Sequence, residues 1–182
     1  MKVLIVVVAI CYSLLRYAWA SGVYITNWPA YIGNKAMAFC AVSFLVTALF
    51  KKTSNNKEAK EYFYLSSISA IAHAAMSMAI LHPEYYNFLF SANNKLNIFG
   101  EFTILFGSLG FGIFVTTSQH TFAKDIALLS IIFAHITSVG ILKWIEPQRW
   151  AYGLVPISLI SGTIIIIGAI IRTKAQKKQK IE

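Results

Sequence analysis

The residues of this chain with the clearest chemical potential are its four histidines, His73, His82, His120 and His135. His73 and His135 each lie inside a long apolar stretch, and imidazole is the side chain that most often binds metals. A polar, ionisable ring is costly in apolar surroundings, so a histidine found there is a candidate for function. We therefore take His73 and His135 as candidate ligands of a metal or of a metal-containing cofactor.

The composition explains what surrounds these histidines. The 182 residues are 57% hydrophobic and 13% charged, whereas a soluble domain carries about 25% charged residues. This difference predicts an integral membrane protein in a lipid bilayer and excludes soluble enzyme folds. The net charge of +9 would suggest nucleic acid in a soluble chain. In a membrane protein it indicates basic cytoplasmic segments, so we expect no nucleic-acid partner.

Six apolar segments are long enough to be membrane-spanning helices, because a helix needs about 20 apolar residues to cross the hydrocarbon core. They cover residues of about 1–20, 30–50, 61–82, 96–118, 122–144 and 150–171, and residues 172–182 form a basic tail. Continuous apolar runs do not fit a transmembrane barrel, whose strands alternate. We expect an all-α membrane protein, with residues 1–182 forming one bundle of six transmembrane helices.

The basic residues predict that both termini are cytoplasmic. If six spans are threaded, 11 of the 16 Lys and Arg residues fall on the side of the termini, as the positive-inside rule requires. Residues 1–20 also fit a cleavable signal peptide, because Lys2 precedes an apolar run and Ala18-Trp19-Ala20. Arg16, close to that cleavage point, favours retention of this segment as a span.

His73 and His135 are expected at equal depth in the membrane. Both spans run outward, and a helical rise of 1.5 Å per residue places the rings roughly 18 Å and 20 Å from the inner boundary. Such a pair can hold one flat metal cofactor between two helices. Heme is the natural candidate, because its iron accepts axial histidines and its ring suits an apolar site. Small residues beside both histidines leave room for it, although they also favour close helix packing.

Other polar residues have weaker functional signals. His82 lies on the face of its helix opposite to His73, and His120 has no histidine partner at its depth, so a second heme is doubtful. Lys35 and Glu101, near the outer ends of spans, are candidate quinone contacts. They would equally suit a pair with each other, or extension of the charged groups into water.

Several short motifs resemble the ferric-reductase-like transmembrane family. Gly33-Asn34-Lys35-Ala36, continuing to Thr47-Ala48-Leu49, resembles the second span of that family. Ala72-His73-Ala74 resembles its first ligand helix, and Thr116-Thr117-Ser118-Gln119 is similar to the end of its fourth span. The resemblance covers residues of about 30–145. It is greatest to the small heme-b membrane subunit that feeds electrons to periplasmic methionine sulfoxide reductase.

The resemblance implies a multi-pass protein of the bacterial inner membrane that binds b-type heme through His73 and His135. Where the family usually has further histidines, this chain has Tyr86 and Arg149, so we expect one heme rather than two. The resemblance also implies a periplasmic or extracellular acceptor. Because these residues include no flavin or nicotinamide domain, a quinol or a partner flavoprotein is the expected electron donor.

The predicted function is therefore electron transfer by a heme-b subunit, one component of a membrane oxidoreductase rather than a complete enzyme, with no catalytic residue of its own. The alternative is a non-catalytic structural or assembly subunit of a larger membrane complex, in which the histidines only pack. A small transporter fits less well, because charged residues within the spans are scarce and paired broken spans are not evident.

Overall fold

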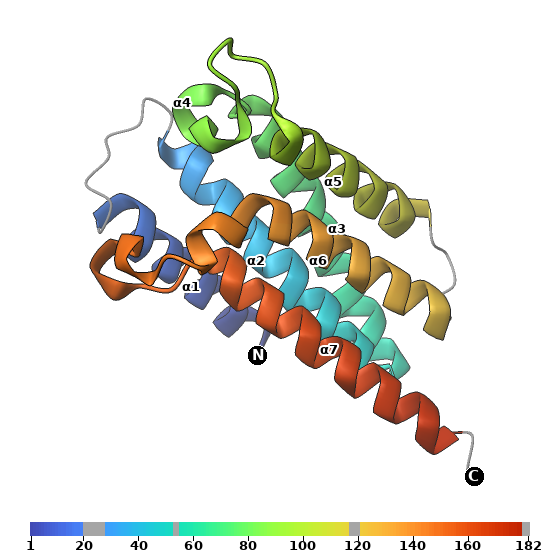
Figure 1. Ribbon diagram of the computed structural model, residues 1–182. Coiled ribbons are helices and arrows are strands. Elements are labelled where there is room, and N and C mark those ends of the chain that lie inside the picture. Colours follow the sequence, from blue (N-terminus) through green and yellow to red (C-terminus); the bar gives the residue numbers. More distant parts are fainter. Residues whose placement is uncertain (20–27, 53–54, 117–120, 180–182) are drawn as a thin grey trace.

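The computed structural model describes residues 1–19, 28–52, 55–116 and 121–179. In this part of the chain all regular structure is helical, apart from one isolated bridge between Phe90 and Leu96. This confirms the all-α prediction. The long helices are α1 (Lys2–Ser13, continued by a π-helix at Leu14–Trp19), α2 (Trp28–Lys51), α3 (Asn56–Ala79), α5 (Ile98–Thr116), α6 (Phe122–Trp144) and α7 (Ile157–Gln179) (Figure 1).

Most of these helices have the length and composition of membrane spans. Among the described residues, five helical segments are long and apolar enough to cross a membrane. The count is six if α3 is taken together with the short segment Pro83–Leu89, which follows it at an angle of 110°. α3 does not qualify alone, because its first turns are polar and its middle is rich in serine. The chain is thus a multi-pass helical membrane protein.

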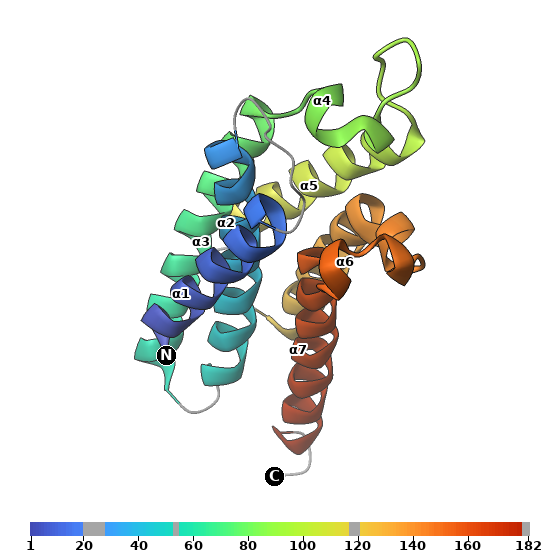
Figure 2. The ribbon, with the colours of Figure 1, turned by 90° about the vertical axis from the view of Figure 1, so that its left-hand side faces the viewer.

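The helices pack as two groups that meet along α2 and α7. α2 packs along α3 and α1, α6 packs along α5 and α7, and α2 also contacts α7. Figure 2 shows α1, α2 and α3 on one side and α6 and α7 on the other. The start of α1 and the end of α7 lie at one end of the bundle, and α4 (Pro83–Tyr86) lies at the opposite end. We call the latter the α4 end.

Two helices differ from their predicted bounds. α3 begins at Asn56, before the predicted start at 61, because the Asn55 side chain accepts a hydrogen bond from the Glu58 backbone N–H (3.1 Å) and caps the helix. α7 begins at Ile157 rather than near 150, because residues 147–153 form two short 3-10 turns. It then continues to Gln179, so most of the predicted basic tail is helical.

The end of the bundle opposite α4 is fastened by a buried carboxylate. Asp125, in the first turn of α6, is fully buried and lies 2.9 Å from Arg172 of α7 and 3.5 Å from Lys52. These contacts join α6, α7 and the residue that directly follows α2. Arg172, predicted in the basic tail, is only 6% exposed. We call Asp125, Arg172 and Lys52 the Asp125 cluster.

Short turns close the α4 end, between the predicted spans 61–82 and 96–118. The His82 side chain accepts a hydrogen bond from the Glu84 backbone N–H (3.3 Å) and so caps α4. Across the bundle, Tyr12 donates to the Val155 carbonyl (2.6 Å), and Arg16 donates to the carbonyl of Leu154. The end of α1 is therefore tied to the segment that leads into α7.

Candidate cofactor site between His73 and His135

A cavity of about 510 Å³ lies among α2, α3, α5, α6 and α7. This volume falls within the roughly 300–1,000 Å³ of most cofactor and ligand pockets. Its wall is largely apolar, which is also typical of such pockets. The polar residues that line it include Asn34, Lys35, His73, Ser77, Tyr86, Thr103 and His135.

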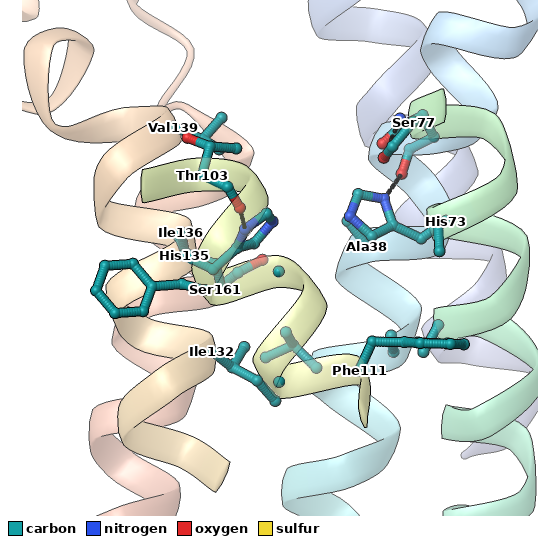
Figure 3. Close-up of a pocket in the computed structure, with 18 of the residues that line it drawn as sticks. Ala38, His73, Ser77, Thr103, Phe111, Ile132, His135, Ile136, Val139 and Ser161 are labelled. Carbon is teal, nitrogen blue, oxygen red and sulfur yellow. Dashed lines mark hydrogen bonds between the residues drawn. The ribbon is translucent and has the colours of Figure 1, made fainter. Parts of the chain in front are cut away.

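His73 of α3 and His135 of α6 lie on opposite walls of this cavity (Figure 3). Their ring centroids are 6.2 Å apart, and the ring planes are inclined by 74°. Two imidazoles that bind one metal atom from opposite sides, each at roughly 2 Å, have centroids roughly 6 Å apart. The observed spacing matches that arrangement. The prediction that the two histidines share one depth is consistent with this proximity.

Hydrogen bonds fix which nitrogen of each ring is free to bind a metal. Nδ1 of His73 lies 3.3 Å from the Asn34 carbonyl oxygen, and Nδ1 of His135 lies 2.8 Å from that of Thr103. A carbonyl can only accept, so each Nδ1 must donate, which leaves the lone pair of a neutral ring on Nε2. Partners of this kind orient metal-binding histidines in many proteins.

The His135 ring rests against the backbone of α5. A Cβ atom added to Gly107 would lie 3.0 Å from Cε1 and Nδ1 of this ring, so any larger residue would require the ring to shift by a few tenths of an ångström. Thr103, four residues earlier, donates to the Ser138 hydroxyl (3.2 Å), and Ser138 donates to the His135 carbonyl (2.8 Å). By contrast, an added Cβ at Gly112 would meet no described atom within 4 Å.

The His73 side of the cavity is formed by small residues and a buried amide. Asn34 is 0% exposed, and its side-chain nitrogen donates to the Ser77 hydroxyl (2.8 Å). Its side-chain oxygen has no hydrogen-bond partner in the described part of the chain. Of the small residues beside His73, Ser66, Ala70, Ala74 and Ser77 line the cavity.

The two candidate quinone contacts, Lys35 and Glu101, differ in whether they line the cavity. Lys35 lines the cavity at its α4 end, where its ammonium group donates to the Tyr86 hydroxyl (3.1 Å). The same group lies 4.6 Å from the Tyr86 ring centroid and 5.1 Å from that of Tyr31. Glu101 is exposed in the first turn of α5 and is not among the described residues that line the cavity.

His82 does not join the site, because it is exposed and caps α4. His120 lies outside the described residues. Tyr86, which the sequence analysis considered only as a departure from a family pattern, is a cavity residue. The only sequence signal for this was its position in an aromatic segment, Tyr85 to Phe90, directly after the histidine helix.

The donor set of the cavity suits one kind of metal group. Within the described residues there is no cluster of three or more His, Cys, Asp or Glu side chains that could hold a bare metal ion. Two opposed imidazoles suffice, however, for a metal that brings its own planar ring of ligands, as heme iron does. The apolar wall and the cavity volume also suit such a ring.

Fold and site together define a multi-pass helical membrane protein with a largely apolar cavity lined by two histidines. No protein-family model, curated protein or solved structure matches the chain. Any assignment of function therefore depends on the chemistry of this cavity.

Proposed function

We propose that the protein is a heme-b-binding electron-transfer subunit of a membrane oxidoreductase, similar to ferric-reductase-like membrane subunits. The observation that carries this proposal is the pair His73 and His135, with centroids 6.2 Å apart and both Nδ1 atoms bound to carbonyls. Heme would supply one-electron chemistry at its iron. His73 and His135 would hold that iron through Nε2, and the apolar wall would keep water away from it.

The proposed topology has six spans, with α3 counted as a span and both termini cytoplasmic. Along the chain, α3 lies between the apolar helices α2 and α5, and it carries His73, one of the two proposed iron ligands. Lys51, Lys52, Lys174 and Lys177 lie at or near the end of the bundle where α1 begins, which supports a cytoplasmic position for that end. The α4 end would then face the periplasm or the exterior, where we place the acceptor. A bacterial inner membrane is the proposed location.

The electron donor is proposed to be a quinol, with a partner flavoprotein as the other source. A quinol would reach the cavity from within the bilayer. Support comes from three apolar side chains that line the cavity and are also exposed on the surface of the bundle, Met78 (75%), Ile104 (39%) and Phe111 (36%). They lie on α3 and α5, which contact each other little. The cavity therefore borders the apolar surface between these helices.

The alternative function is that of a structural or assembly subunit without a cofactor. Its basis is that each histidine ring already has a backbone hydrogen-bond partner, as a packed core histidine would. A purely structural core would, however, be expected to close around the two rings, because protein interiors pack with few voids. The cavity between them favours the heme proposal.

Absorption spectroscopy of the purified protein tests the proposal. We expect a low-spin b-type spectrum that is lost in both His73→Ala and His135→Ala. The matched control is His82→Ala, which removes an exposed histidine and should keep the spectrum. A correctly folded wild-type protein that takes up no heme would contradict the proposal and favour the structural alternative.

A further inference from the structure

Positive charge without a matching carboxylate gathers at the α4 end of the cavity. Lys35 lines the same cavity as His73 and His135. Lys143 lies 5.3 Å from the centroid of the Phe88 ring, just after α4, and Arg16 donates to the Leu154 carbonyl. Within the described residues, none of these three cations has a carboxylate within 4 Å. A cation that borders an apolar cavity without a counter-charge is costly, which indicates that a ligand supplies the charge.

The hydrogen-bond donors beside Lys35 are suited to an anion. An ammonium group has three donors, and Lys35 uses one of them on the Tyr86 hydroxyl. Tyr86 is 6% exposed, and its hydroxyl still has its own proton to donate. The Asn34 amide adds a third group, because the Ser77 hydroxyl can accept from its nitrogen or donate to its oxygen. Either end of this buried amide can therefore face the ligand.

We infer that the α4 end of the cavity is a carboxylate site, in which Lys35 and the Tyr86 hydroxyl bind the carboxylates of a planar ring held between His73 and His135. This inference rests on the proposed function, because heme is such a ring and carries two propionates on one edge. It fixes the orientation of the ring, with the propionate edge toward α4. Lys35 then serves the resident cofactor, and a quinone, which has no carboxylate, would have to bind elsewhere.

The test compares two forms of the same ring in the heme-free, full-length protein. Hemin has two free carboxylates, and hemin dimethyl ester has none. We expect the wild-type protein to bind hemin about tenfold more tightly than the ester, as a charge-assisted hydrogen bond in a sheltered site implies. Both forms should give low-spin spectra, because the iron ligands are unchanged. Equal affinity of the two forms would overturn the inference.

Variants separate charge from the added bulk of the ester. Lys35→Met should reduce the preference for hemin to nearly one, Tyr86→Phe should reduce it partly, and Lys35→Arg should retain it. Lys95→Met, which removes an exposed lysine outside the cavity lining, is the matched control and should bind like wild type. A preference that survives Lys35→Met would also overturn the inference.

The outcomes distinguish this inference from the proposed function. If neither hemin nor its ester binds with a histidine-dependent low-spin spectrum, the proposed function fails. If both bind in that way with equal affinity, the proposed function stands and the carboxylate site fails. Equal affinity in the wild-type protein is enough to reject the carboxylate site, so this rejection does not depend on whether a given variant folds.

Discussion

The two ends of the bundle differ in whether their buried or cavity-lining charges have partners of opposite charge. In the Asp125 cluster, a fully buried carboxylate has Arg172 at 2.9 Å and Lys52 at 3.5 Å, so its charge is matched inside the protein. At the α4 end, Lys35 borders the cavity with a tyrosine hydroxyl and two aromatic rings around it, but with no described carboxylate. The difference indicates that the first group holds helices together, and it is the basis for our inference that the second binds an anionic ligand.

This distinction matters in a helical membrane protein, where polar groups inside the bundle are few. In a buried ion pair that joins helix ends, each charge stabilises the other, and removing either partner leaves an isolated charge. A cation beside a cavity that has no carboxylate partner lacks this stabilisation. The opposed histidines next to Lys35 suggest what fills the cavity, and the charge suggests how that ligand is oriented.

The largest expected effect on stability is at the Asp125 cluster. Asp125→Asn leaves Arg172 buried without its counter-charge and should lower the free energy of unfolding by about 3 kcal/mol. The matched control is Lys35→Met, which removes a cation that forms no ion pair with a carboxylate in the described part of the chain. It should change the free energy of unfolding by less than about 1 kcal/mol. Thermal unfolding of both variants in detergent, in the heme-free state, measures the contrast. Similar losses in both would contradict our distinction between the two ends.

A smaller and more local effect is expected in the wall of the cavity. Gly107→Ala places a Cβ atom 3.0 Å from the His135 ring, so the ring must move and its iron-binding geometry worsens. We expect about a tenfold loss of heme affinity, which corresponds to about 1.4 kcal/mol of binding free energy, with little change in thermal stability.

Gly112→Ala is the control for this change. It lies on the same helix, where an added Cβ meets no described atom within 4 Å, and it should bind heme like wild type. Titration of each heme-free variant with hemin gives the affinities. If Gly107→Ala binds heme as tightly as Gly112→Ala, the contact between α5 and the His135 ring has no part in holding the cofactor.

Much of the fold could be predicted from the sequence, because apolar runs of about 20 residues permit few alternatives. The predicted spans correspond to α1, α2, α3, α5, α6 and α7, and the structure places His73 and His135 close together, as two ligands of one cofactor would have to be. The departures lie at helix ends, where hydropathy is a poor guide. The cap at Asn55 and the turns at 147–153 depend on local hydrogen bonds rather than on apolar length.

The parts of the site that depend on packing could not be predicted. Nothing in the sequence places Tyr86 beside Lys35. Tyr86 lies in α4 and Lys35 in α2, and the turn between α3 and α4 brings the two side chains together. The pairing of Asp125 with Arg172 likewise depends on how α6 and α7 meet. The sequence predicts Lys35 and Glu101 equally as candidate quinone contacts. In the structure, only Lys35 is among the described residues that line the cavity.

The most direct test of the central claim is electron paramagnetic resonance of the oxidised wild-type protein, combined with a count of heme per chain. The ring planes of His73 and His135 are inclined by 74°, which is nearly perpendicular. We predict one heme per chain with the strongly anisotropic low-spin signal that near-perpendicular imidazoles give. A high-spin signal, or protein that binds no heme at all, would contradict the claim that His73 and His135 hold a single iron between them.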